Sequence, residues 1–270
     1  MKNITILCPA KINLFLNILD RKDNMHVLKM LNQSVSLFDI ITLEENNTQD
    51  INIVCSNSSI PTNQKNSVFK AIMVMKDKYN IACGFNINII KSIPTLAGLG
   101  GESTDAAGVI LGINKLLKLN LSKKELIDIG IKVGSDVPFS IMGGTRIVES
   151  IGESIRKCKT IYKYFLIIKP NFNTSTTDMF NKYDLEVKNY KRYKKIVIGH
   201  NDFEKVAPLE INNIKKLLIS NGAIIANMTG SGSSVIGIFN DFNSQKKAYN
   251  DLKNSYEVYL VNSCDGIIIK

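Results

Sequence analysis

A glycine-rich segment at residues 94–107, PTLAGLGGESTDAA, constrains the fold of this chain more than any other stretch. It follows the alternating apolar run FNINII and leads into a stretch whose apolar residues recur every three or four positions, from Ala106 to Leu117. This order predicts a strand, a glycine-rich turn and a helix that begins inside the segment. Glycine lets a ligand approach main-chain N–H groups, and the first turn of a helix adds unpaired N–H donors. The segment is therefore suited to bind an anion, in particular a di- or triphosphate.

The segment does not end in the Gly-Lys-Ser/Thr of a P-loop but carries Glu102, Ser103, Thr104 and Asp105. The hydroxyls of Ser103 and Thr104 are suited to donate to a phosphate or to ligate Mg²⁺. A plain turn that ends in a helix cap is the alternative that the segment alone leaves open. A carboxylate beside a phosphate is repelled unless a cation lies between them. The side chain of Glu102 therefore either turns outward, which we expect because glutamate is usually exposed, or helps to position a cation.

Further elements of the first half are predicted from their apolar patterns. Short runs rich in Ile, Val, Leu and Phe predict strands at residues 4–8, 13–19, 39–45, 51–56 and 85–90. Helical spacing predicts a helix at 67–79, and the pair Ser122 and Glu125 predicts a capping box that opens another helix, which ends before Gly134. The first half therefore mixes strands and helices.

The second half predicts a separate α+β unit. Strands are expected at 164–170, 223–228, 234–239 and 256–263, and helices at 210–222 and 244–254. With a short helix near 179–183, the order is that of a ferredoxin-like unit. We therefore expect two domains, at residues 1–155 and 156–270, with a ligand site between them.

Composition narrows the class of protein. The net charge is +10, but the lysines are spread along the chain apart from a cluster at 188–195, and no nucleic-acid-binding pattern accompanies them. The five cysteines are far apart, and the N-terminal residues contain no apolar run typical of a signal peptide or a membrane span. We expect a cytoplasmic enzyme or binding protein that has a small-molecule ligand, no nucleic-acid or membrane partner, and a monomeric or homodimeric state.

Two further polar segments accompany the glycine-rich one. The segment CPAKINLFLNI, residues 8–18, places Lys11 and Asn13 just after the first expected strand, and MTGSGSSVIGIF, residues 228–239, is a second glycine-serine loop between expected strands. One such cluster is commonly a turn, but three clusters beside strands favour a single polyphosphate site.

Taken in order, the segments PAKINLFL, PTLAGLGGESTDAAG and MTGSGSSVIG resemble the three motifs of the GHMP kinase superfamily. The resemblance implies an α+β, two-domain fold, with an N-terminal ribosomal-protein-S5-domain-2-like α/β domain that binds ATP and a C-terminal ferredoxin-like domain. It also implies an ATP- and Mg²⁺-dependent transfer of phosphate to an alcohol group. The segments at residues 23–31, 66–71, 134–139 and 201–204 are similar to those of a branch whose acceptor carries a cytosine base.

The same resemblance assigns roles to residues of this chain. It implies that Asp136 is the catalytic base and that Lys11 assists it, although each alone reads equally as a loop aspartate or a surface lysine. For the metal it implies Ser103. The residues expected around ATP are Asn66, Lys91, Pro94, Ala97, Gly98, Leu99, Gly100, Gly101, Glu102, Ser103 and Thr104.

For the acceptor, the resemblance implies that His26 reads the cytosine and that Phe180 stacks on it. The other residues expected to contact the acceptor or to close the site around it are Asn13, Met25, Thr176, Gly230, Ser231 and Gly232.

Two departures from the family pattern concern this acceptor pocket. Asn24 and Met25 stand where a glycine and a stacking tyrosine are usual, and Asn32 stands at a place that is aromatic in at least some members. We expect both changes to lie in the acceptor pocket. They leave open a kinase with a different acceptor or a catalytically silent nucleotide-binding protein.

Overall fold

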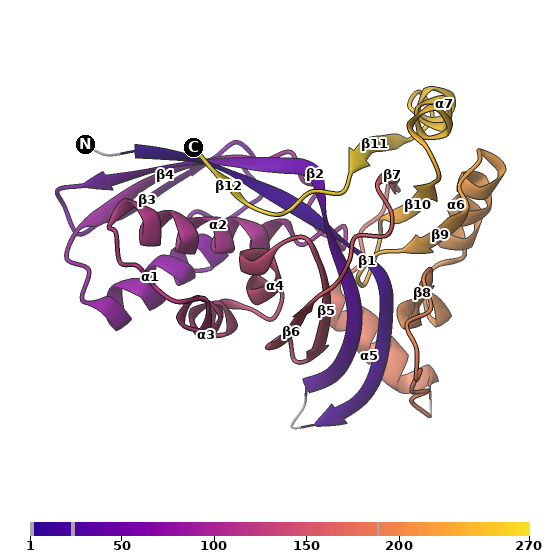
Figure 1. Cartoon of the computed structure of the whole chain (residues 1–270), viewed down its shortest axis with the longest axis horizontal. Coiled ribbons are helices and arrows are strands. Elements are labelled where there is room, and N and C mark those ends of the chain that lie inside the picture. The colour runs from indigo at the N-terminus through magenta and orange to yellow at the C-terminus, as the bar shows by residue number, and fades with distance from the viewer. Residues whose placement is uncertain (1–2, 23–24, 188) are drawn as a thin grey trace.

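The chain folds into two β-sheets, each covered by helices on one face (Figure 1). The computed structural model describes residues 3–22, 25–187 and 189–270, so Asn24 and Lys188 lie outside it. The strands are β1 (Asn3–Lys22), β2 (Met25–Asn46), β3 (Ile51–Cys55), β4 (Gly84–Ile90), β5 (Thr145–Ser150), β6 (Ser154–Lys157), β7 (Tyr164–Lys169), β8 (His200–Asn201), β9 (Ile225–Met228), β10 (Val235–Phe239), β11 (Glu257–Asn262) and β12 (Ile268–Ile269). The helices are α1 (Ser67–Tyr79), α2 (Gly101–Leu116), α3 (Lys123–Val133), α4 (Val137–Met142), α5 (Thr176–Glu186), the 3₁₀ helix η1 (Asp202–Lys205), α6 (Leu209–Ser220) and α7 (Phe242–Leu252).

The first sheet is built around the long antiparallel pair β1 and β2. Two strands that the sequence predicts separately, at 4–8 and 13–19, are one strand, so Lys11 and Asn13 lie inside β1 and not after a strand. Pro9 lies between the two predicted strands, and proline lacks the N–H that a sheet requires. Here the register between β1 and β2 shifts directly after Pro9, and such a bulge accommodates the proline without ending the strand.

The first part of β2 and the strands β5 and β6 were not predicted. In β2, three consecutive polar residues, Asn32, Gln33 and Ser34, are all buried. They interrupt the apolar alternation on which strand prediction depends, so this part of the sequence resembles a loop. The buried polar run indicates that something other than an apolar core lies against the middle of β1 and β2.

The helices of the first half follow their sequence signals closely. Helix α1 covers 67–79 as predicted, and α3 opens with the predicted capping box of Ser122 and Glu125 and ends before Gly134. Helix α2 begins at Gly101, inside the glycine-rich segment. Together with α4, these helices cover one face of the first sheet (Figure 1).

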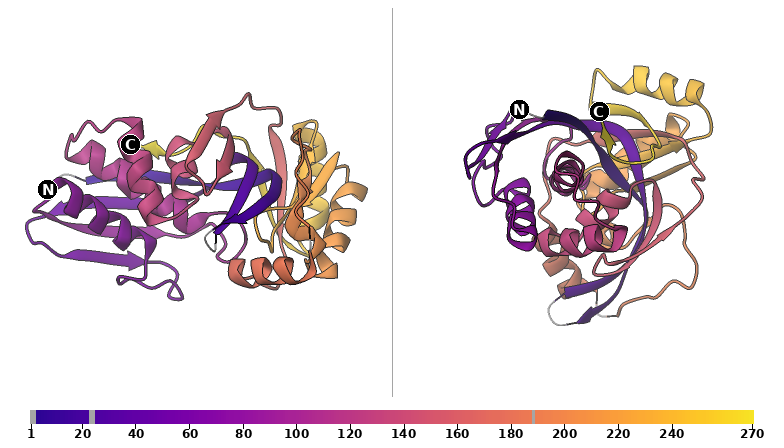
Figure 2. Two further views of the ribbon diagram at one scale, coloured as in Figure 1. Left: turned by 90° about the horizontal axis from the view of Figure 1, so that it is seen from below. Right: turned by 60° about the vertical axis from the view of Figure 1, so that its left-hand side comes forward.

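The second sheet has the strand order β11-β7-β10-β9, with every neighbouring pair antiparallel. This is the order of the predicted ferredoxin-like unit, which the structure confirms. Helices α6 and α7 cover its outer face (Figure 2), and its inner face packs on the first sheet. In β7, for example, Phe165 and Ile167 contact the cluster formed by Ile12 and Leu14 of β1.

Both halves of the chain contribute to the first sheet, because β8 and β12 return to pair with β1. A domain division between residues 155 and 156 therefore stays a prediction, although the second sheet begins soon afterwards, at Tyr164. No helix in the described ranges combines the length and the apolar character needed to cross a membrane.

A buried carboxylate joins η1 to β1. The side chain of Asp202 is fully buried and accepts hydrogen bonds from Asn17 Nδ2 at 2.6 Å, Ile18 N at 2.7 Å and Lys205 Nζ at 2.7 Å, while His200 Nε2 lies 3.2 Å away. Burial raises the pKa of Asp202, but these hydrogen bonds outweigh it and bring the pKa to about 2.

We expect Asp202→Asn to lower the free energy of unfolding by about 3 kcal/mol, because an amide cannot accept from all these donors. The carboxylate's contribution of about 2 kcal/mol is complete above the unfolded pKa near 3.8 and is lost as the pH falls towards 2. Urea unfolding between pH 3 and pH 7 measures both effects. The exposed Asp251→Asn is the control, and equal stability of the two variants would contradict the assignment.

Candidate active site

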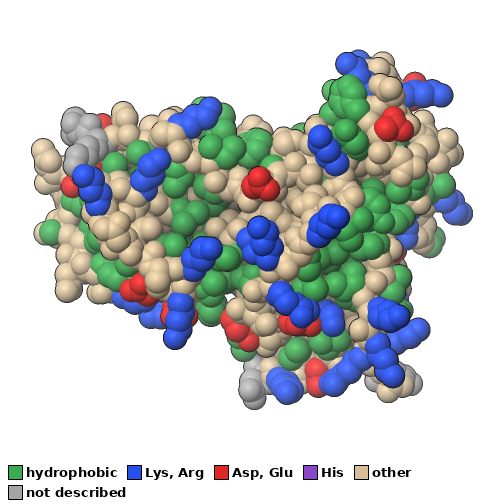
Figure 3. Space-filling view, viewed as in Figure 1, with side chains coloured by type: hydrophobic (Ala, Val, Ile, Leu, Met, Phe, Trp, Pro, Cys, Tyr) green, Lys and Arg blue, Asp and Glu red, His purple; other side chains and the backbone are tan. Residues whose placement is uncertain are grey.

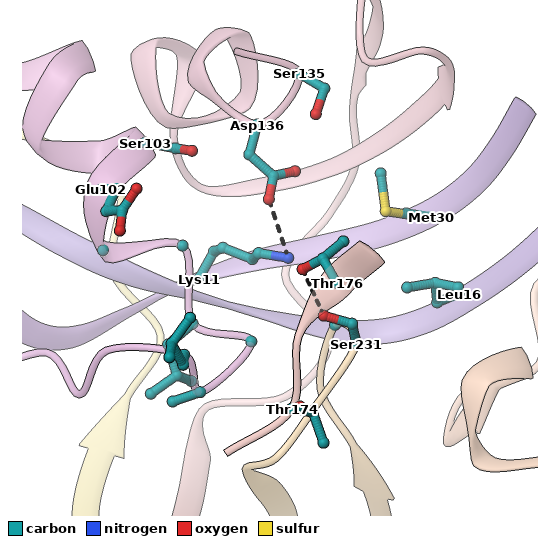
Figure 4. Close-up of a pocket in the computed structure, with 18 of the residues that line it drawn as sticks. Lys11, Leu16, Met30, Glu102, Ser103, Ser135, Asp136, Thr174, Thr176 and Ser231 are labelled. Atoms are coloured by element: carbon teal, nitrogen blue, oxygen red, sulfur yellow. Dashed lines mark hydrogen bonds and ion pairs between the residues drawn. The ribbon is translucent and has the colours of Figure 1, made fainter. Parts of the chain in front are cut away.

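A cavity of about 620 Å³ lies between the two halves of the structure (Figure 4). The glycine-rich segment lines one end of it, α5 and the loop between β9 and β10 line another side, and β1, β2 and the start of α4 complete it. The site is therefore assembled from segments that are far apart in the sequence.

Most of the residues predicted from the sequence lie on this cavity, whereas Asn13, Asn66 and Thr104 do not line it. Those that line it are Lys11, Met25, His26, Lys91, Pro94, Ala97, Gly98, Leu99, Gly100, Gly101, Glu102, Ser103, Asp136, Thr176, Phe180, Gly230, Ser231 and Gly232.

The glycine-rich segment forms a turn that only glycine fits. Gly98 and Gly100 have φ values of 72° and 70°. A Cβ at Gly100 would lie 2.9 Å from Lys11 Cγ, and one at Gly98 would collide with the Thr229 carbonyl. The main-chain ladder of α2 starts where Thr104 N donates to Gly100 O at 3.0 Å. The N–H groups of residues 101–103 are therefore left for an anion in the cavity.

Lys11 and Asp136 face each other in the cavity (Figure 4). Lys11 Nζ lies 3.4 Å from Asp136 Oδ2 and donates to Asn13 Oδ1 at 2.9 Å. Lys11 is almost buried, whereas the Asp136 side chain is 30% exposed, so a ligand can reach the carboxylate. Asp136 precedes α4 as its N-cap residue, and its side chain makes no capping hydrogen bond. The site thus holds a carboxylate and a cation that are ready to act on a hydroxyl group.

Lys91 lines the cavity, but its ammonium is already paired with two carboxylates. Its Nζ pairs with Asp39 Oδ2 and, at 2.7 Å, with Asp105 Oδ2. Burial lowers the pKa of Lys91, but the two carboxylates outweigh it and raise the pKa above its usual value. Burial raises the pKa of Asp105 to about 8, against the opposing charge of Lys91 and with the help of Asp39. Because Asp105 pairs with Lys91, its side chain does not line the main cavity.

Three residues predicted to bind the nucleotide, Asn66, Thr104 and Glu102, differ in how they lie relative to the main cavity. Asn66 lines a small neighbouring cavity that shares Lys91 and Glu102 with the main one, and its Oδ1 caps α1 by accepting from Val68 N at 2.8 Å. Thr104 is buried, and within the described residues its Oγ1 has no partner. Glu102 is exposed, as expected, but it lines both cavities, and Figure 4 shows it on the main one.

At the other end of the cavity, His26 and Phe180 stack on each other, with ring centroids 4.0 Å apart. His26 Nε2 lies 2.8 Å from Asp184 Oδ1, and the same carboxylate accepts from Tyr190 Oη at 3.0 Å and from Arg21 at 2.8 Å. Burial raises the pKa of Asp184, but the hydrogen bonds from His26 and Tyr190 and the charge of Arg21 outweigh it and lower the pKa. An ionised Asp184 accepts, so Nε2 of His26 donates.

Sequence reasoning missed Asp184 and Asp39. Asp184 lies four residues after Phe180, so both occupy one face of α5, and that spacing was the available signal. Asp39 carried no signal, because its partner Lys91 is distant in the sequence.

Of the two departures from the family pattern, only one lies in the acceptor pocket. Met25 lines the cavity and is 49% exposed. Asn32 was expected there too, but it is fully buried behind the cavity, where its Oδ1 accepts from Asn13 Nδ2 at 2.7 Å. Asn32 shares a face of β2 with Met30, which lines the cavity, but Asn32 itself is fully buried and paired with Asn13, so the expectation that it lines the cavity was wrong.

Comparisons with known proteins agree with this geometry. Residues 66–144 match the family model of the GHMP kinases N-terminal domain, and residues 196–258 match that of the GHMP kinases C-terminal domain. A curated relative from Clostridium perfringens is 36% identical, with 95% of this chain and 97% of the relative covered. One from Thermoanaerobacter pseudethanolicus is 36% identical over 95% of this chain and 94% of its own length. Both are named 4-diphosphocytidyl-2-C-methyl-D-erythritol kinase.

Solved structures share the fold. A 4-(cytidine 5'-diphospho)-2C-methyl-D-erythritol kinase superposes with a TM-score of 0.82 at 21% identity, covering 97% of this chain and all of that one. The homoserine kinase of Cytophaga hutchinsonii gives 0.77 at 19% identity, covering 100% and 98%. Fold and site thus define an ATP-dependent small-molecule kinase of the GHMP type. Within that class, the chain belongs to the family of the 4-diphosphocytidyl-2-C-methyl-D-erythritol kinases.

The turn at Gly100 gives a test of the anion site. We expect Gly100→Ala to weaken the binding of a non-hydrolysable ATP analogue by at least about tenfold, because the new Cβ strains the backbone and displaces Lys11. Gly222→Ala is the matched control, since φ is also positive there, 93°, but open space surrounds the position. Calorimetric titration measures both, and parental affinity in Gly100→Ala would contradict the assignment.

Proposed function

We propose that this chain transfers the γ-phosphate of ATP to the 2-hydroxyl of 4-diphosphocytidyl-2-C-methyl-D-erythritol, a step of the non-mevalonate route to isoprenoid precursors. The observation that carries the proposal is the pair Lys11 and Asp136, 3.4 Å apart on a cavity that the glycine-rich segment also lines. A binding protein needs neither group, whereas phosphate transfer to an alcohol uses both.

In the proposed reaction, Asp136 accepts the proton of the acceptor hydroxyl while that oxygen bonds to the γ-phosphorus. The bond from this phosphorus to the bridging oxygen of ADP breaks at the same time. The positive charge of Lys11 lies beside Asp136, and its ammonium donates a hydrogen bond to the oxygens that gain negative charge. The N–H groups of residues 101–103 hold the phosphates at the start of α2.

Mg²⁺ fits the chemistry of the same region. The hydroxyl of Ser103 and the carboxylate of Glu102 line the cavity and offer the hard oxygen ligands that this ion prefers. Among the described residues, no group of three His, Cys, Asp or Glu side chains is placed to hold a metal alone. The nucleotide's phosphates and water would therefore complete the ligand set, and the bound ion would neutralise phosphate charge.

The hydrogen bond between His26 and Asp184 supports a cytosine-containing acceptor. In the neutral imidazole, an Nε2 that donates to the carboxylate leaves Nδ1 as an acceptor. The exocyclic amino group of cytosine donates to such a nitrogen, whereas uracil presents a carbonyl oxygen at the same place.

We also propose that the chain acts in the cytoplasm, where its five free cysteines stay reduced. Its two domains divide between residues 155 and 156, and it works as a monomer or a homodimer.

We expect Asp136→Asn to lower kcat by about 10²- to 10⁴-fold, because an amide cannot accept the hydroxyl proton. The affinity for ATP should stay within about twofold, since Asp136 is separate from the phosphate-binding N–H groups. Steady-state kinetics and nucleotide titration measure the two quantities. Asp128→Asn, an exposed change on α3, is the control. Unchanged turnover in Asp136→Asn would exclude it as the base.

We expect His26→Ala to raise the KM for the cytidine acceptor by about 10- to 100-fold, which corresponds to the loss of one good hydrogen bond and its stacking contact. The KM for ATP should not change, and the preference for the cytidine acceptor over its uridine analogue should disappear. An assay of both acceptors with ATP and Mg²⁺ tests this. Turnover of a different GHMP-kinase acceptor alone would favour the alternative kinase, and no turnover with any acceptor would favour a silent homologue.

A further inference from the structure

Asn32 is a fully buried polar residue that the proposed reaction does not use directly. It lies opposite Asn13 in the register of β1 and β2, and its Oδ1 accepts from Asn13 Nδ2 at 2.7 Å. Asn13 is fully buried as well. Burying two amides costs free energy unless their polar atoms are paired, so the hydrogen bond between Asn13 and Asn32 offsets part of that cost.

The contact fixes which way the Asn13 amide points. Asn13 Oδ1 accepts from Lys11 Nζ at 2.9 Å and from Gly230 N at 2.8 Å. Both partners can only donate, so this end of the amide must be the oxygen. The opposite end must then donate, and its acceptors are Asn32 Oδ1 and the weakly accepting Met30 Sδ at 3.4 Å. Without Asn32 Oδ1, the Asn13 amino group would lose its 2.7 Å partner inside the protein.

The orientation of Asn13 in turn determines where Lys11 lies. The ammonium of Lys11 can donate three hydrogen bonds. One goes to Asn13 Oδ1, a second is directed at Asp136 Oδ2, which lies 3.4 Å from Nζ, and the third is left for the transferred phosphate or the acceptor oxygen. A turned or displaced Asn13 would break the first of these hydrogen bonds and let the ammonium move away from this position. A shift of about 1 Å in such a group is enough to slow a reaction that depends on positioning.

We propose that Asn32 is a positioning residue for phosphate transfer, which holds Lys11 beside Asp136 by fixing the amide of Asn13. The chain of contacts runs from Asn32 through Asn13 and Lys11 to Asp136, and none of its first three members is more than 6% exposed. The inference rests on the proposed roles of Lys11 and Asp136. It does not depend on which alcohol is the acceptor.

A double-mutant cycle tests this proposal. We expect Asn32→Leu and Asn13→Ala each to lower kcat by about tenfold or more, with KM for ATP within about twofold. The double variant should be no slower than Asn13→Ala alone, because Asn32 acts only through Asn13. Asn32→Asp, which keeps an oxygen acceptor for Asn13 Nδ2, should restore most of the lost kcat. A residue that merely supports the fold would give additive losses and no such rescue.

Gln33→Leu is the matched control, because Gln33 is a buried amide on the same strand whose contacts run to Ser34 and Thr145 and not to Lys11. It should lose stability but keep kcat. If Asn32→Leu does not fold, Asn32→Ala takes its place in the cycle. Parental kcat in the Asn32 variant, or additive losses in the double variant, would overturn the inference. Parental kcat in Lys11→Met would instead overturn the proposed role of Lys11.

Discussion

The site depends on the close contact between the glycine-rich segment and both sheets. Lys11 N of β1 donates to Leu99 O at 2.9 Å, and Ser234 N, just before β10, donates to Ala97 O at 3.3 Å. The backbone at Gly98 lies so close to Thr229 that no side chain fits between them. Because the segment is bonded to both sides, the start of α2 is held over the seam where the two sheets meet. Lys11, Asp136 and the N–H groups at the start of α2 therefore share one rigid frame.

A buried cluster of three charged side chains, Asp39, Lys91 and Asp105, holds the two ends of the glycine-rich segment. Asp39 Oδ1 accepts from Ser92 N at 2.6 Å and from Ile93 N at 2.9 Å, and so holds the chain just before the turn. Its other oxygen pairs with Lys91, which also contacts Asp105 at the start of α2. Through these contacts the cluster ties β2, the end of β4 and the start of α2 together beneath the glycine-rich segment.

The sequence predicted those parts of the fold that depend on local signals. The capping box at Ser122, the period of α1 and the order of elements that form the second sheet are of this kind, and so are the glycines of the turn before α2. The sequence failed where long-range contacts override the local pattern. Pro9 ends a strand on local rules, but a bulge carries β1 past it. The spacing from Phe180 was a weak signal for Asp184, and no spacing reveals the pairing of Asp39 with Lys91.

The departures from the family pattern have different physical meanings once they are placed in space. Met25 lies on the cavity wall, as His26 does, so the chain presents a thioether to the cavity where the family pattern has an aromatic ring. Asn32 lies behind Lys11, which it reaches through Asn13, and it does not line the cavity. Of the two positions, Met25 alone can therefore touch a ligand in the cavity. A substitution at Met25 changes the surface that a ligand meets, whereas one at Asn32 changes only the contacts behind Lys11.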